Sequence, residues 1–136
     1  MAKKGNPKLT PEEKQALRTR LREGKGAQGE AAVLSALASW PEPDRTLGER
    51  LHALIRRQAP FLTPRLWYGM PAYALEGKVL CFLQPAHKFQ TRYATLGFTD
   101  RAQLEEGNMW PVAFGLKELG PAEEARIGEL LRRALA

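Results

Sequence analysis

The sequence predicts an α+β fold, with an antiparallel sheet of about four to five strands and helices packed on one face. Helical patterns fill roughly the first 60 of the 136 residues, extended segments follow, and one helical pattern closes the chain. This separation of helices from strands is typical of α+β proteins with antiparallel sheets. The segment Val79–Leu83 is apolar at every position, which indicates a strand that is covered on both faces or lies centrally in the sheet. The chain is long enough to bury a core without disulfides or a metal.

Two helices are expected before residue 40. Thr10–Glu13 reads as a helix start, because Thr10 can cap free amides and a proline and a glutamate follow at favourable positions. This helix is expected to run to about residue 23 and to have a thin apolar side. The glycines of Gly24–Ala27 predict a flexible joint, after which a second helix spans about 28–39.

A third helix is expected from Arg45 to about Gln58, with Asp44 as its N-cap. Its leucines and isoleucine recur at i, i+4, i+7 and i+8, a stripe that favours burial against the sheet. His52 flanks this stripe. A single histidine in such a place is more often a packing residue than a ligand.

The strands follow. Arg65–Met70 and Ala72–Leu75 are expected to be extended, with a kink at Met70–Pro71 because proline interrupts a sheet. Glu76–Lys78 predicts a tight hairpin turn whose glycine supplies a positive φ. The apolar strand Val79–Leu83 comes next.

The last third of the chain predicts four elements. Phe89–Leu96 reads as a strand, and residues 101–105 as a short helix capped by the preceding Thr-Asp pair. Residues 110–116 are expected to form a final strand. Gly120–Glu124 opens a C-terminal helix, because proline and acids occupy its first turn.

The net charge of +6 is unevenly distributed, since residues 1–26 contain eight basic residues and only three acidic ones. We therefore divide the chain into a basic N-terminal arm with one helix (1–26) and a single α+β domain (27–136). Such an arm could contact nucleic acid or another polyanion. The alternative is a solvated helix that keeps the protein soluble. The candidate polyanion-binding residues are Lys3, Lys4, Lys8, Lys14, Arg18, Arg20, Arg22 and Lys25.

Several patterns predict a cytoplasmic protein. Cys81 is the only cysteine, which fits a reducing compartment and excludes an intramolecular disulfide. No apolar run approaches the roughly 20 residues that span a bilayer. The basic N-terminus lacks the apolar segment of a secretory signal. We expect no membrane association, and a monomer or homodimer.

The sequence favours no catalytic chemistry. Cys81 lies in an apolar strand, where a thiol is protonated and inert. His52, His87 and Cys81 do not have the spacing of metal ligands. The acidic residues come as isolated pairs, and no glycine-rich nucleotide fingerprint is present. No catalytic residue, metal ligand or cofactor is therefore predicted.

The sheet surface is the strongest candidate for a function. Aromatic and flexible apolar side chains, with cations close in sequence, suit an apolar pocket that has a few polar groups at its rim. The alternative is that most of these aromatics belong to the core. The candidate ligand-binding residues are Trp67, Tyr68, Met70, Tyr73, Lys88, Arg92, Tyr93 and Trp110.

The run WYGMPAYALEGKVLCFLQPAHKFQTRYATLGF resembles the YdhG-like family of unknown function, in the YjbR/CyaY-like superfamily. The pieces YGMPAY, EGKVLCF and LGERLHALIRRQAP carry the resemblance, which extends over residues 10–135. It implies a frataxin-like fold, with helices on one face of an antiparallel sheet. The family supplies no catalytic residues.

Three functions are therefore open. The first is a non-enzymatic binding or adaptor domain that takes a small molecule or protein at the sheet surface. The second is nucleic-acid association through the basic arm, since YjbR-like proteins are often described as DNA-binding. The third is iron handling, as in the frataxins. This chain departs from the frataxin pattern, because its N-terminal helix is basic and no acidic ridge can be drawn.

Overall fold

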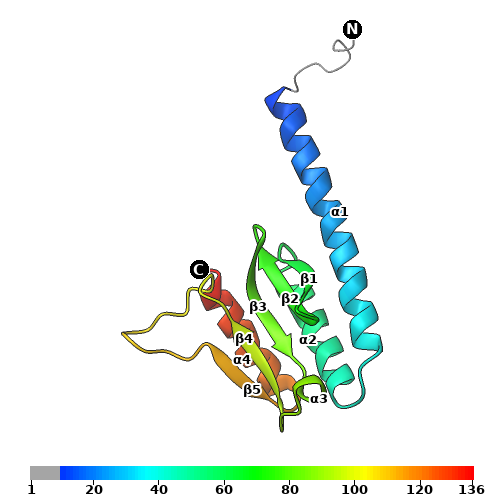
Figure 1. The fold of residues 1–136 in the computed structure, drawn as a ribbon. Coiled ribbons are helices and arrows are strands. Elements are labelled where there is room, and N and C mark those ends of the chain that lie inside the picture. The colour runs from blue at the N-terminus through cyan, green and yellow to red at the C-terminus, as the bar shows by residue number, and fades with distance from the viewer. Residues whose placement is uncertain (1–9) are drawn as a thin grey trace.

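The computed structural model describes the backbone of residues 10–136 and the side chains of residues 10–17 and 26–136. Helices and strands follow one another along the chain as shown in Figure 1. In order, they are α1 (Pro11–Ala38), α2 (Asp44–Gln58), β1 (Thr63–Trp67), β2 (Met70–Leu75), β3 (Lys78–Gln84), α3 (Ala86–Phe89), β4 (Ala94–Phe98), β5 (Ala113–Leu116) and α4 (Pro121–Ala134).

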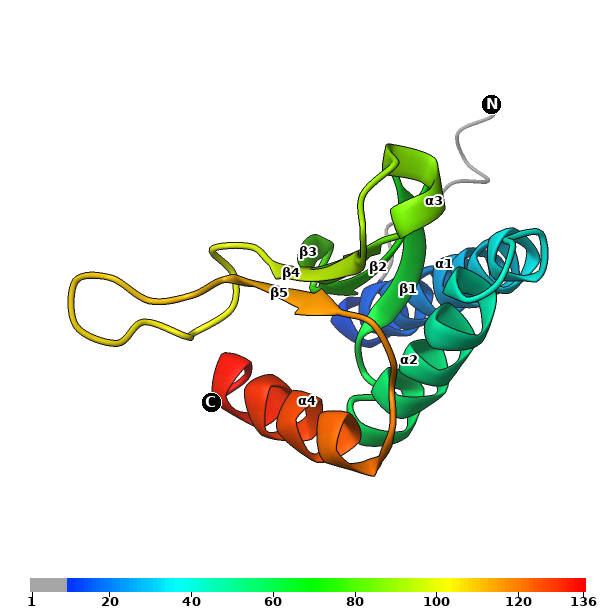
Figure 2. The ribbon, with the colours of Figure 1, turned by 90° about the horizontal axis from the view of Figure 1, so that it is seen from below.

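The five strands form one antiparallel sheet in the order β1-β2-β3-β4-β5. Helices α2 and α4 lie on the same side of this sheet, and α1 runs along the β1 edge (Figure 2). The α+β class, the antiparallel sheet and the helices on one face are therefore confirmed. The face opposite α2 and α4 is called the outer face below.

Helix α1 corrects the prediction of two helices joined at Gly24–Ala27. It begins at the predicted capping box, where Thr10 and Glu13 bond to each other's backbone amides, and it continues without a break to Ala38. A glycine inside a helix costs only about 1 kcal/mol, which packing can offset. A Cβ on Gly29 would lie 1.9 Å from the carbonyl oxygen of Pro64, so this glycine lets α1 approach the backbone of β1.

Two tight turns connect the first three strands. Tyr68 and Gly69 both have positive φ, and so do Glu76 and Gly77, which is typical of two-residue hairpin turns. The second turn confirms the predicted hairpin. The first ends β1 at Trp67, so the predicted extended segment to Met70 and the kink at Met70–Pro71 were wrong.

The irregularity in β2 lies instead between Tyr73 and Ala74, where β3 has one extra residue. At such a bulge, two consecutive side chains can point to the same face of a sheet. Leu80 and Cys81 are both fully buried, which explains why this strand is apolar without alternation. Burial raises the pKa of the Cys81 thiol to about 12, as expected for an inert core cysteine.

Three predictions in the last third of the chain were wrong. Residues 86–89 form the short helix α3, and Gln90 ends it in the left-handed conformation, so the strand begins only at Ala94. Residues 101–105 are not helical but belong to an irregular loop, in which Ala102 and Leu104 are buried. This loop extends away from the body (Figure 1) and β5 starts at residue 113, not 110. The C-terminal helix α4 is confirmed.

The core fills the space between the sheet and the helices. Val33 and Leu37 of α1 join it together with the predicted stripe of α2 and the apolar face of α4. Within residues 10–136, no helix has the length and apolar character needed to cross a membrane.

Candidate functional site

The outer face, which α2 and α4 leave open, carries a cluster of aromatic rings (Figure 2). The Trp67 ring lies 5.2 Å from the Tyr68 ring and 5.2 Å from the Phe82 ring, between ring centres. Tyr68 is 80% exposed at the tip of the β1–β2 turn. We call Trp67, Tyr68 and Phe82 the ring cluster.

Glycine on β4 makes room for this cluster. Phe82 pairs with Gly97, and a Cβ on Gly97 would lie 2.3 Å from the Phe82 ring. The ring therefore lies flat over the neighbouring strand. At the cluster's margin, the Lys88 ammonium donates to the carbonyl oxygen of Tyr68 at 3.1 Å. The outer face thus presents an apolar surface of mutually tilted rings with a cation beside it.

A second ring lies at the other end of the outer face. Tyr93 lies over Gly115 of β5, where a Cβ would be 2.9 Å from the ring. The Arg92 guanidinium lies 5.5 Å from the centre of the Tyr93 ring, a cation–π arrangement. Both side chains are exposed.

The structure does not bring the eight predicted ligand-binding residues into one pocket. Trp67, Tyr68 and Lys88 gather at the β1–β2 turn, and Arg92 and Tyr93 lie before β4. Met70 pairs with Trp67 across the β1–β2 turn but is buried. The remaining two are separate from both groups: Tyr73 is buried on the helix-covered face, and Trp110 is partly buried against the core. Ligand binding by these residues stays a prediction.

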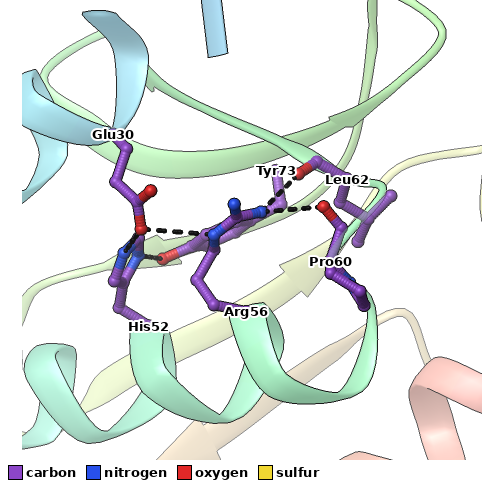
Figure 3. A network of polar contacts seen from close by, with 6 residues as sticks. All are labelled: Glu30, His52, Arg56, Pro60, Leu62 and Tyr73. Atoms are coloured by element: carbon purple, nitrogen blue, oxygen red, sulfur yellow. Dashed lines mark hydrogen bonds and ion pairs between the residues drawn. The ribbon is translucent and has the colours of Figure 1, made fainter. Parts of the chain in front are cut away.

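Tyr73 belongs to a polar network that joins α1, α2 and β2 (Figure 3). Its hydroxyl lies 2.8 Å from Nδ1 of His52, and Nε2 of His52 lies 2.8 Å from Oε2 of Glu30. Arg56 donates to the same Glu30 oxygen at 3.2 Å and to the carbonyl oxygens of Pro60 and Leu62. The network therefore ties α1 to the body.

A single tautomer of the His52 imidazole provides a hydrogen-bond partner for both polar groups that contact the ring. A carboxylate only accepts, so Nε2 carries a proton for Glu30, and Nδ1 then accepts from the Tyr73 hydroxyl. The His52 hydrogen bond and the nearby Arg56 charge hold the pKa of Glu30 below its ordinary value. Burial raises the pKa of Tyr73, which keeps its hydroxyl a donor. This arrangement is structural, because both ring nitrogens of His52 are occupied.

The second histidine lies in a different setting. Asp44, at the start of α2, is 4% exposed and its Oδ2 accepts from the backbone amide of His87 at 2.8 Å and from Nδ1 of His87 at 2.6 Å. Nδ1 therefore carries a proton, and Nε2 is left available. The His87 side chain is 33% exposed and lines a pocket of about 380 Å³ between α2, α3 and the ends of β4 and β5.

Sequence reasoning missed the pairing of Asp44 with His87. It placed Asp44 as an N-cap, whereas Pro43 holds that position and the aspartate side chain reaches α3 across 43 residues of sequence. No local spacing indicates such a contact. The sequence shows only an aspartate and a histidine that each follow a proline, and neither pattern specifies a partner.

The basic arm is described only in part. Lys14 is exposed on α1. Lys3, Lys4 and Lys8 lie outside the described residues, as do the side chains of the other candidates, Arg18, Arg20, Arg22 and Lys25. The predicted boundary at residue 26 falls inside α1, whose C-terminal half packs on the body and whose N-terminal half extends past it (Figure 1).

Within the part of the chain that the structure describes, no group of three or more His, Cys, Asp or Glu side chains is arranged to hold a metal ion. Comparisons with protein-family models, with curated proteins and with solved structures each found no match to this chain. The resemblance to the YdhG-like family and its frataxin-like fold therefore stays a prediction.

Proposed function

We propose that the protein is a non-enzymatic binding domain that takes a small molecule or a segment of a protein on the outer face of its sheet. The observation that carries this proposal is the ring cluster, where Tyr68 is 80% exposed and Trp67 and Phe82 lie beside it on a face that α2 and α4 leave open. Exposed aromatic surface of this kind is typical of binding sites.

The geometry also favours a class of ligand. Flat rings stack on flat apolar groups, and a cation at the margin attracts negative charge or a carbonyl oxygen. Lys88 holds such a position, because its ammonium is anchored to the backbone of Tyr68 at 3.1 Å. The preferred ligand is therefore a planar group with an electron-rich or anionic substituent.

A thermal-shift screen of planar metabolites tests this proposal. A ligand should raise the melting temperature of the wild-type protein, and the shift should disappear in Tyr68→Ala and shrink in Lys88→Gln. Phe61→Ala is the matched control, since this ring is also well exposed, at 60%, but lies before β1 and outside the ring cluster. A shift that survives in Tyr68→Ala would place the ligand elsewhere.

A second candidate is association with nucleic acid through the basic arm. Its support is the direction of α1, whose N-terminal part extends past the body (Figure 1). The described side chains there, residues 11–17, are exposed and belong to a segment rich in Lys and Arg. Phosphate contacts make such binding steeply salt-dependent.

Fluorescence anisotropy with labelled DNA at several salt concentrations tests this second candidate. Replacing the eight basic residues of 1–26 with Gln should remove binding. Arg132→Gln with Arg133→Gln, at the other end of the chain in α4, should leave it unchanged. Equal binding by both variants would contradict a role for the arm.

We also propose that the chain is a cytoplasmic member of the YdhG-like family. The single buried Cys81 fits a reducing compartment. The segments that carry the resemblance occupy α2 and the β2–β3 hairpin, which is consistent with a shared framework.

A further inference from the structure

The pocket beside Asp44 and His87 is separate from the ring cluster and has a chemistry of its own. Its volume of about 380 Å³ suits a small metabolite. Part of its wall is apolar, formed by Leu47 of α2, Leu116 of β5 and the Tyr93 side chain. The polar part of the wall decides which ligand it can take.

The ionisable groups that line this pocket are Glu42, Asp44, His87, Arg92, Tyr93 and Lys117. Both acidic side chains, Glu42 and Asp44, already accept hydrogen bonds from other residues of the protein. Glu42 accepts from the Arg45 guanidinium at 2.8 and 3.0 Å and from the amide of Thr46 at 3.1 Å, contacts that lower its pKa. Asp44 accepts both bonds from His87.

The basic groups, in contrast, are available. Among the side chains that the structure describes, no carboxylate lies within ion-pair distance of Arg92 or Lys117. Arg92 is held against the Tyr93 ring at the pocket wall. Asp44 orients the His87 ring, so that a protonated imidazole has Nε2–H as its one uncommitted donor.

We propose that this pocket binds a small phosphorylated molecule, with His87, Arg92 and Lys117 around the phosphate and the apolar wall against the organic part. A phosphate group has three terminal oxygens and suits several charge-assisted donors at once. The buried Asp44 positions the His87 ring by accepting a hydrogen bond from its Nδ1. Asp44 is a positioning residue, since His87 lies between it and the ligand.

Isothermal titration calorimetry with phenyl phosphate, at low salt, tests the proposal. The wild-type protein should show saturable 1:1 binding. His87→Gln, Arg92→Gln and Lys117→Gln should each raise the dissociation constant about tenfold, the effect of losing one charge-assisted hydrogen bond. Arg92 and Lys117 are exposed, so their variants test the site even if His87→Gln alters folding.

Lys78→Gln is the matched control, since it removes a similarly exposed lysine at the start of β3, outside the pocket. Its dissociation constant should equal that of the wild type. Phenol, which lacks the phosphate, should bind at least tenfold more weakly if the cations supply the affinity. The proposal is overturned if phenyl phosphate gives no saturable heat, or if Lys78→Gln weakens binding as much as Arg92→Gln and Lys117→Gln do.

Discussion

The two histidines of this chain occupy sites that differ in one respect, the number of ring nitrogens that the fold already uses. His52 is 5% exposed and bonds to Tyr73 and Glu30 on either side of its ring. His87 is partly exposed, and Asp44 takes only its Nδ1. Each ring is oriented by a carboxylate, yet only His87 keeps a nitrogen for another molecule.

This difference separates a structural histidine from a binding one. A buried polar group is tolerated when its partners are complete, and losing one partner costs the desolvation of the other. His52 therefore connects three elements, and His87 presents a fixed donor to a pocket. We therefore expect that removing the His52 ring destabilises the protein more than removing the His87 ring does.

The largest effect is expected from truncating the two rings. His52→Ala should lower the free energy of unfolding by about 2–4 kcal/mol, because it leaves a cavity and strips the buried Tyr73 hydroxyl of its acceptor. His87→Ala should cost only about 1 kcal/mol, since Asp44 keeps the backbone amide and solvent can replace the ring. Urea denaturation followed by circular dichroism measures both.

Equal losses of unfolding free energy in His52→Ala and His87→Ala would contradict this distinction between the two histidines. They would indicate that His87 is as important for folding as His52. Tyr73→Phe provides an intermediate case, because it keeps the ring and removes only the hydroxyl that donates to His52.

Much of the framework was predictable because local signals determined it. The capping box at Thr10, the hairpin glycine at Gly77 and the Pro-Glu-Glu start of α4 each act within four residues. The glycines near residue 26 misled for the opposite reason. Glycine permits a turn, but it is also tolerated inside a helix that tertiary packing stabilises, and the packing of α1 on β1 joins residues far apart in sequence.

The candidate sites were less predictable, since their contacts join residues far apart in sequence. The Tyr73 hydroxyl, a predicted ligand-binding group, has a buried hydrogen-bond partner in the structure. That partner is the His52 side chain. Trp67 and Tyr68 were placed on the sheet surface, and they lie there, yet the β1–β2 turn that gathers them was read as a strand. The periodicity of apolar residues predicts which face of a helix or strand a residue occupies. It says little about which helices and strands pack against one another.

The next effect concerns the contact of α1 on which the His52 network depends. Gly29→Ala should destabilise the protein by about 1–3 kcal/mol, because its Cβ would overlap the Pro64 carbonyl and push α1, with Glu30, away from His52. Gly26→Ala is the matched control. Its Cβ would approach Thr63 no closer than 3.9 Å, so the higher helix propensity of alanine should stabilise the protein by up to about 1 kcal/mol.

Thermal unfolding of both glycine variants, followed at 222 nm, measures these changes. Opposite signs are expected from the same substitution three residues apart. Stabilisation by both alanines would mean that α1 does not rest on β1 at residue 29. The contact with Glu30 would then contribute little to the burial of His52.

The smallest effect is the response of the His52 network to acid. Because its bonds to His52 and Arg56 lower the pKa of Glu30 in the folded protein, its stabilising contribution is present above the ordinary value of 4.5 and is lost as pH falls through the lowered one. Glu30→Gln should therefore flatten the decline in stability between about pH 5 and 3, by about 1 kcal/mol. Glu118→Gln, which changes an exposed carboxylate between β5 and α4, should keep the wild-type slope. An unchanged slope in Glu30→Gln would mean that the carboxylate contributes no more to the His52 site than an amide does, and that Tyr73 alone distinguishes this histidine from His87.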